Sequence, residues 1–201
     1  MKREEQKNIN RNTILSAAYS IMVKKGITNT SIKEISDKSK ISPVTMYKYF
    51  DDKESLAEQV ALQFYKKNMS EMVEVAQSNN ILFKEKIRLF EKKHEEMHDI
   101  LSPVAFNDFL LMTKKSELVK NYCDQIQKKI VLLMIDSGRK SGAITTAAND
   151  KTIFIFANIF MDYLSQKNEP LPNDLLNDLE LLFRFGVQGQ CQGTKKPHTH
   201  F

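Results

Sequence analysis

Two histidines and a glutamate of this chain stand at the spacing of a helical metal site. His94, Glu95 and His98 form the pattern His-Glu-x-x-His. Residues four apart on a helix share one face, so both imidazoles could bind one zinc ion while the glutamate acts as a general base. A zinc-dependent hydrolase that uses His94, Glu95 and His98 is therefore one alternative that the sequence leaves open.

The residues around this pattern favour a different interpretation. The run 91–93 is fully charged, and no third ligand follows at the spacing of a known zinc enzyme. His94 also continues an apolar helical stripe from Phe90, as a hydrogen-bonded histidine in a protein core would. We accordingly expect no enzyme, with no catalytic residue, no metal site and no cofactor. His94 and His98 are instead candidates for polar groups in a ligand pocket.

A second set of polar side chains, between residues 30 and 49, has the chemistry that contacts DNA. Hydroxyl, phenol and ammonium groups donate hydrogen bonds to phosphate oxygens, and a small apolar side chain such as Val44 can touch a thymine methyl group. Hydroxyls and backbone amides at a helix start are also a natural phosphate site. The set comprises Thr30, Ser31, Ser42, Val44, Thr45, Tyr47, Lys48 and Tyr49.

Two helices are predicted to precede and support the most polar part of this set. Apolar residues at helical spacing predict a first helix over 9–25, which Gly26 ends. Thr30 or Ser31 can then cap a short second helix, and Glu34 has the spacing of a capping box.

A third short helix is predicted to carry the polar side chains themselves. Ser42 is a suitable N-cap and Pro43 a suitable first residue, so this helix is expected over 44–50. Two short helices joined by a tight turn and supported by a longer one make a helix-turn-helix unit. Such a unit inserts its second helix into the major groove of DNA.

The remainder of the chain is also predicted to be helical, so the expected fold class is all-α with about nine helices. The sequence has six glycines and five prolines, which are few turn-forming residues for an all-β fold. Further helices are expected at 51–76, 81–100, 104–112, from 116 or 117 to Gly138 or Gly142, at 151–164 and at 174–185.

Charge and composition are compatible with a DNA partner. The net charge is +5, and residues 1–60 carry 11 basic and 8 acidic residues against 19 and 17 in the remaining chain. Positive charge is thus denser in the segment that holds the predicted helix-turn-helix. No apolar stretch approaches the roughly 20 residues that cross a bilayer, and two cysteines make no disulfide framework. We expect a soluble, cytoplasmic protein with no membrane partner.

The residues from Ile14 to Leu56 follow the pattern of one group of bacterial regulators. The matching residues are Ile14, Ala17, Ala18, Gly26, Thr30, Ile32, Ile35, Ile41, Ser42, Tyr47, Lys48, Tyr49, Phe50, Lys53, Glu54 and Leu56. In these residues the chain resembles the DNA-binding domain of the TetR family of transcriptional regulators. The spacing Tyr-x-x-Phe-x-x-Lys-x-x-Leu, from Tyr47 to Leu56, is the most specific mark of this resemblance.

The resemblance implies a role for each matching polar position. Residues that would contact backbone phosphates are Thr30, Ser31, Tyr47, Tyr49 and Lys53. Residues that would lie on or near base edges are Ser42, Pro43, Val44, Thr45 and Lys48. The chain departs from the family at Ser36, where alanine is usual, and at Lys40, where glycine is frequent. Lys40 would lie in a left-handed turn, which costs a residue with a side chain about 1 kcal/mol.

The resemblance also implies a helix-turn-helix domain at 1–55, a ligand-sensing and dimerisation domain at 56–188 and a tail at 189–201. The helix 151–164 is apolar on nearly every side, and together with 174–185 it predicts a homodimer. Soft Met and Phe side chains in the middle helices favour a pocket for an unidentified, largely apolar small molecule. The candidate ligand-binding residues are His94, Met97, His98, Phe106, Phe109 and Met112.

These observations predict a ligand-responsive regulator. By the usual mode of the family, it would be a repressor that binds double-stranded operator DNA and releases it when a small molecule binds. A helical adaptor that binds protein rather than DNA remains a further alternative to this prediction.

Overall fold

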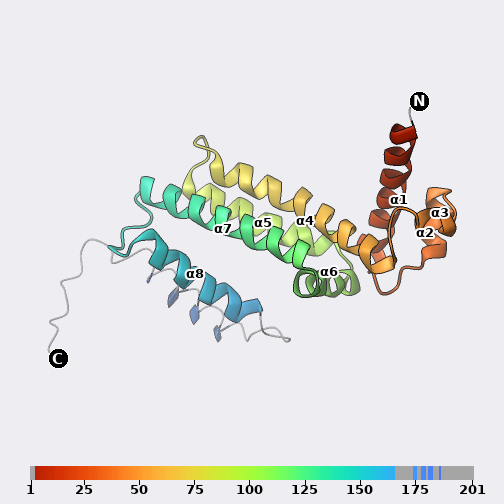
Figure 1. Ribbon diagram of the computed structural model, residues 1–201. Coiled ribbons are helices and arrows are strands. Elements are labelled where there is room, and N and C mark those ends of the chain that lie inside the picture. Colours follow the sequence, from red (N-terminus) through yellow and green to blue (C-terminus); the bar gives the residue numbers. More distant parts are fainter. Residues whose placement is uncertain (1–2, 166–173, 176–177, 180, 183–185, 187–201) are drawn as a thin grey trace, which may run out of the picture. The chain divides into compact units, whose positions relative to one another are not determined.

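A computed structural model describes residues 3–165 and the isolated positions 174–175, 178–179, 181–182 and 186 (Figure 1). This part of the chain contains helices and no strand, which confirms the all-α fold class. The helices are α1 (Arg3–Lys25), α2 (Ile32–Ser39), α3 (Pro43–Met46), α4 (Lys53–Gln77), α5 (Phe83–Ile100), α6 (Pro103–Lys115), α7 (Glu117–Lys140) and α8 (Asp150–Ser165). Within the ninth helix expected at 174–185, the described positions 174–175, 178–179 and 181–182 are helical, and the other residues of that range lie outside the described part of the chain.

The chain forms two compact units. The first consists of Met1–Val75 and Ile87–Gln127, and the second of Ala76–Lys86 and Lys128–Phe201. The first unit contains α1 to α3 together with α6, and these helices share one hydrophobic core.

Helix α1 begins six residues earlier than the apolar pattern predicts. The segment before Ile9 is charged and polar, but Glu4 and Glu5 in the first turn complement the positive end of the helix dipole. At the other end, Gly26 adopts φ 91°. A Cβ atom there would lie 2.7 Å from a carboxylate oxygen of Asp108 and 2.8 Å from Val104, so both conformation and space require glycine.

Helix α2 has the capping box that the sequence predicts. The Ser31 hydroxyl accepts a hydrogen bond from the Glu34 backbone N–H at 3.2 Å, and the Glu34 carboxylate accepts one from the Ser31 backbone N–H at 2.8 Å. The helix ends at Lys40, which adopts φ 58° and ψ 24°. The left-handed turn between the two short helices is therefore present although its residue is not glycine.

Helix α3 starts as predicted but is shorter than the predicted range 44–50. The Ser42 hydroxyl accepts a hydrogen bond from the Thr45 backbone N–H, and Pro43 is the first helical residue. After Met46 the chain turns more tightly, because the Lys48 N–H bonds to the carbonyl of Thr45, three residues back. The predicted range was wrong at its C-terminal end, where the helix gives way to consecutive turns.

One hydrophobic core joins the short helices to α4, α6 and α7. It includes the fully buried Ile14, Ile35 and Leu56, and the rings of Phe64 and Phe109 meet edge to face at 5.0 Å. Aromatic pairs in this geometry contribute about 0.5–1.5 kcal/mol beyond their buried area. The helix-turn-helix is thus packed on the following helices through apolar side chains.

The second unit has its own smaller cluster, formed by Ile135, Ile144 and Ile153. A buried lysine of the same unit, Lys86, donates hydrogen bonds to the Ala76 carbonyl at 2.8 Å and to the Ser137 hydroxyl at 3.0 Å. An ammonium group at a helix C-terminus is stabilised by the helix dipole. No helix among residues 3–165 is both long and apolar enough to span a bilayer.

The left-handed turn at Lys40 yields a stability prediction. Lys40→Gly should raise the free energy of unfolding by about 1 kcal/mol, because glycine adopts this conformation without a Cβ conflict. Thermal unfolding followed by circular dichroism measures the change. Lys40→Ala removes the same charge but keeps the Cβ atom, so it should leave stability nearly unchanged; equal stabilisation by both variants would exclude backbone strain as the cause.

Candidate DNA interface

The side chains of α3 and its flanks divide sharply into buried and exposed. Met46 exposes 2% of its surface and Phe50 6%, whereas Val44 exposes 73% and Tyr47 51%. Ser42, Pro43 and Lys48 are exposed as well. Apolar anchors on one side therefore hold a mixed polar and apolar surface outward on the other.

Two of the candidate base-reading hydroxyls also bond to each other. The Ser42 and Thr45 hydroxyl oxygens lie 3.0 Å apart, and the Ser42 oxygen caps the helix at the same time. Ser42 is exposed and Thr45 half-buried. This mutual bond fixes the rotamers of both side chains before any partner arrives, which lowers the entropic cost of a contact.

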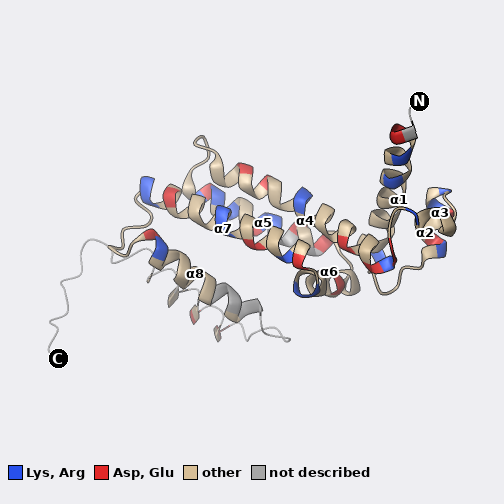
Figure 2. Ribbon diagram, viewed as in Figure 1, with Lys and Arg blue, Asp and Glu red and all other residues tan. Residues whose placement is uncertain are grey.

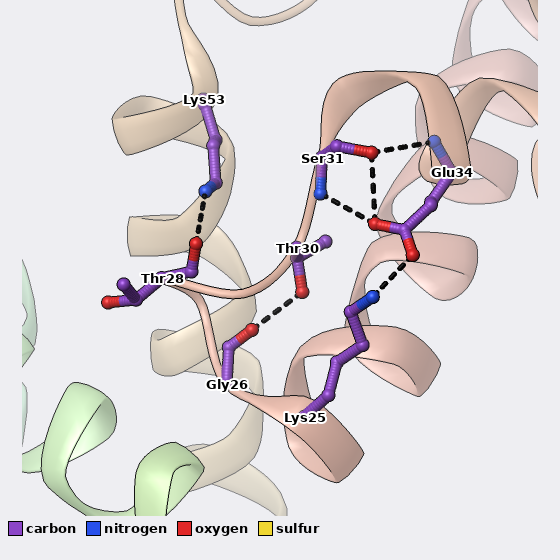
Figure 3. A network of polar contacts seen from close by, with 7 residues as sticks. All are labelled: Lys25, Gly26, Thr28, Thr30, Ser31, Glu34 and Lys53. Carbon is purple, nitrogen blue, oxygen red and sulfur yellow. Dashed lines mark hydrogen bonds and ion pairs between the residues drawn. The ribbon is translucent and has the colours of Figure 1, made fainter.

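The start of α2 is held by a polar network (Figure 3). The Glu34 carboxylate accepts hydrogen bonds from the backbone and the hydroxyl of Ser31, and pairs with the Lys25 ammonium group at the end of α1. The bond from Lys25, together with those from Ser31, lowers the pKa of Glu34 to about 2. The network ties the first two helices together at an exposed helix start.

Thr30 lies within the same turn but not at the surface. It exposes 2% of its area, and its hydroxyl donates to the Gly26 carbonyl at 2.6 Å, as Figure 3 shows. The Thr30 hydroxyl thus satisfies a free carbonyl at the end of α1, and its contact with a phosphate stays a prediction. Ser31, the next residue, is exposed.

Lys53 begins α4 and reaches back to the same turn. Its ammonium group donates to the Thr28 carbonyl at 3.4 Å. The Thr28 backbone N–H and hydroxyl in turn donate to the Asp108 carboxylate of α6, both at 2.8 Å. Thr28 is thus bonded both to Lys53, a candidate phosphate contact, and to Asp108 of α6. The bond to Asp108 spans 80 residues, and no local sequence signal indicates it.

Basic residues surround the exposed surface of α2 and α3. Lys33, Lys38, Lys40 and Lys48 are all exposed, and Figure 2 shows basic positions on α2, on the segments beside α3 and along α1. Acidic positions occur between them, so the field is only moderately positive. Such a distribution suits a duplex contact that depends on placed donors as well as on charge.

Tyr49 is half-buried and packs against the core, whereas Tyr47 is exposed. The Tyr49 hydroxyl oxygen accepts a hydrogen bond from the Asn10 side-chain amide at 3.1 Å. The adjacent Arg11 places its guanidinium group 5.2 Å from the centre of the Phe50 ring. Asn10 and Arg11 were not among the predicted site residues, because their partners lie 39 residues away.

The candidate ligand-binding residues occupy different environments. Phe109 and Met112 are buried in the core, and Met97 and Phe106 are partly buried against it. The side chains of His94, Glu95 and His98 lie outside the described residues, so the structure gives no geometry for the zinc pattern.

Two grooves accompany these helices in the first unit. A groove of about 290 Å³ lies against α6, and its lining includes Thr28, Lys53, Asp108, Leu111 and Met112. A second, of about 170 Å³, lies between α4 and α5 and is lined in part by Met72, Val75, Leu89, Phe90 and Lys93. Met112 is thus the candidate that combines a buried position with contact to a groove.

Comparison with known sequences identifies the motif. Residues 14–60 match the family described as bacterial regulatory proteins, tetR family. A relative from Bacillus subtilis strain 168, the uncharacterized HTH-type transcriptional regulator YvkB, is 27% identical over 153 residues, which are 75% of this chain and 78% of the relative.

Solved structures share the fold. The reduced form of NemR from E. coli matches with a TM-score of 0.53 at 17% identity, covering 86% of this chain and 95% of the other. A protein of Mesorhizobium loti, assigned to the TetR family of transcriptional regulators, matches with a TM-score of 0.55 at 18% identity, covering 94% and 96%. At these identities the likeness concerns the fold.

Buried side chains anchor the short helix α3 to the capped helix α2, and the polar side chains of α3 face outward. This arrangement is that of a DNA-binding helix-turn-helix protein. Through residues 14–60 the chain is similar to the tetR family of bacterial regulatory proteins, and these matches indicate a transcriptional regulator rather than an enzyme. The matches give no support to the zinc hydrolase or to the protein-binding adaptor.

The polar network at α2 predicts a pH dependence. Because the pKa of Glu34 is lowered from 4.5 to about 2, its stabilisation is complete above pH 4.5 and is lost as pH falls toward 2. An NMR titration of the Glu34 side chain should show this low midpoint. Ser31→Ala should move the midpoint upward, and a midpoint near 4.5 in the unmodified protein would contradict the network.

Proposed function

We propose that this regulator is a homodimeric repressor that binds operator DNA through α3 and releases it when a largely apolar small molecule binds. The observation that carries the DNA-binding part is the division of α3 into buried anchors and exposed polar groups. Met46 and Phe50 hold the helix, so Val44, Tyr47 and Lys48 project where a duplex can reach them.

The exposed residues fall into two functional groups in this proposal. Ser42, Pro43, Val44, Thr45 and Lys48 contact base edges, through hydroxyl and ammonium donors and through apolar contact with thymine methyl groups. Ser31, Tyr47, Tyr49 and Lys53 contact phosphates, which fixes the register without reading sequence. Thr30 contributes through its place in the backbone turn, since it is buried whereas Ser31 is exposed.

A dimer is supported by the apolar surface of α8. Ile153 and Ala157 of this helix are buried, but Ile159 exposes 63% of its surface, Ile155 48% and Tyr163 41%. Exposed apolar area of this kind mostly marks a contact with another protein surface. We propose that a second copy of the chain covers it, since two helix-turn-helix units read a longer site than one.

Response to an effector is supported by the link between Thr28 and Asp108. A molecule that binds near α6 and shifts this helix would alter the hydrogen bonds between Asp108 and Thr28. Thr28 lies in the turn between α1 and α2, so the turn would move as well. The effector would favour whichever of two arrangements of α6 and this turn it binds more tightly, and the difference in affinity sets the size of the shift. The proposed effector contacts remain His94, Met97, His98, Phe106, Phe109 and Met112.

The described cysteine does not favour a thiol-based signal. Burial raises the pKa of the Cys123 thiol to about 11, with a smaller contribution from the Asp124 carboxylate. A thiol of that pKa is protonated near neutral pH and is a poor nucleophile. The proposal therefore relies on non-covalent binding of the effector.

The central test is binding of the full-length protein to the DNA upstream of its own gene. Fluorescence anisotropy should show tighter binding to that duplex than to an unrelated duplex of equal length, with affinity that falls as salt rises. Equal, weak binding to both duplexes would contradict an operator function. Sedimentation velocity on the same sample reports whether the bound species is a dimer.

Tyr47→Ala should weaken binding to both duplexes by a similar factor, roughly three- to tenfold, because a phosphate contact carries no sequence information. Tyr47→Phe removes only the hydroxyl and serves as the matched control for loss of the ring. If Tyr47→Ala instead changed the operator preference at constant affinity, the phosphate role would be wrong.

Asp108→Ala should lower the free energy of unfolding by about 1–2 kcal/mol, because it removes two charge-assisted hydrogen bonds from Thr28. Amide hydrogen exchange should accelerate at Thr28 in this variant, and Thr28→Val should have a smaller effect since its backbone bond remains. Unchanged exchange at Thr28 in Asp108→Ala would show that α6 does not hold this turn.

A further inference from the structure

We infer that Asn10 of α1 is a positioning residue that turns the Tyr49 hydroxyl into a dedicated hydrogen-bond donor for a DNA phosphate. This inference rests on the proposed DNA-binding function and deepens it. It adds α1, which lies outside the two short helices of the motif, to the machinery of phosphate recognition.

The observation is a chain of hydrogen bonds that runs in one direction. The Gln6 amide nitrogen donates to the Asn10 amide oxygen at 3.0 Å, and the Asn10 amide nitrogen donates to the Tyr49 hydroxyl oxygen at 3.1 Å. Gln6 and Asn10 are four residues apart and share a face of α1. Because the Asn10 oxygen is occupied by a donor, its nitrogen is the group that faces Tyr49.

The direction of this chain decides what Tyr49 can do. A tyrosine hydroxyl has one proton to donate and oxygen lone pairs that accept. Asn10 occupies an acceptor position, which leaves the proton for an outside partner. A phosphate oxygen only accepts hydrogen bonds, so it matches the group that remains, and a one-way chain of donors strengthens each bond in it.

The Tyr49 ring cannot easily turn away from this geometry. It is half-buried against the core beside Phe50, while Arg11, the neighbour of Asn10, lies over the Phe50 ring and donates to the Gln59 amide oxygen at 3.3 Å. Asn10 and Arg11 of α1 thus contact Tyr49 and Phe50, respectively, which follow α3. The ring is fixed by packing, and Asn10 selects the direction of its proton.

Substitution of Asn10 by aspartate separates positioning from simple packing. Aspartate has the same shape, but its carboxylate only accepts, so it would take the Tyr49 proton and reverse the last bond of the chain. The contact between α1 and Tyr49 would persist while the donor for the phosphate would be lost. A purely structural role for Asn10 would not produce this combination.

The test measures the affinity of the full-length protein for the upstream duplex and for the unrelated duplex, with thermal unfolding in parallel. Asn10→Ala should weaken binding to both duplexes by about three- to tenfold. Asn10→Asp should weaken binding further while the melting temperature stays within a few degrees of the unmodified protein. In a Tyr49→Phe background, Asn10→Ala should cause no additional loss.

Asn8→Asp supplies the matched control, since it makes the same change at an exposed position two residues away on α1. It reports the general effect of one negative charge, and Asn10→Asp must exceed it. Unchanged affinity in Asn10→Ala, equal losses in Asn8→Asp and Asn10→Asp, or a full loss from Asn10→Ala in the Tyr49→Phe background would each overturn the inference alone. Absence of DNA binding by the unmodified protein would overturn the proposed function, and the inference with it.

Discussion

Burial of Met46 and Phe50 is the constraint on which the DNA-facing surface depends. Helix α3 has four residues, fewer than an isolated helix needs for stability in water. Its position therefore comes from its anchors, each of which contributes roughly 1.5–3 kcal/mol when fully buried. The left-handed residue Lys40 and the cap at Ser42 set the angle at which the helix leaves α2. Apolar packing on the buried side of α3 thus determines which polar side chains its exposed side presents.

The same core extends beyond the helix-turn-helix and makes the two proposed activities of the first unit dependent on each other. Phe64 of α4 and Phe109 of α6 pack together within the cluster that also contains Ile14 and Ile35. Because protein interiors are close-packed, a displacement of α6 is transmitted to its neighbours rather than absorbed. The Asp108 carboxylate adds a directional connection to that packing, since it holds both donors of Thr28.

Local signals made the fold and much of the site predictable from the sequence. The capping box of Ser31 and Glu34, the end of the first helix at Gly26 and the Ser42-Pro43 start follow from short local patterns, and each is confirmed. Where prediction was wrong, the controlling contact was distant or opposed the local pattern. The C-terminal end of α3 is a set of turns, although its residues continue a helical sequence.

Side-chain roles depend even more on distant partners. A threonine before a helix has the same local sequence whether its hydroxyl faces solvent or bonds to a carbonyl, and here it bonds to Gly26. The Asn10–Tyr49 and Thr28–Asp108 bonds span 39 and 80 residues, so no pattern in a short window could indicate them. Likewise, Met and Phe are soft, apolar side chains that suit a core and a pocket equally, and Phe109 lies in the core.

The small size of α3 connects the DNA surface to the proposed dimer. Few side chains of one short helix and its flanks can reach base edges, and each correct contact discriminates by only about 1–3 kcal/mol. One copy would therefore recognise too few bases to select an operator among many competing sites. Two copies related by a two-fold axis would contact twice as many bases and so distinguish the operator from other sites, provided that a stable interface joins the copies. Ile155 and Ile159 of α8, which are large apolar side chains with exposed surface, are suited to that requirement.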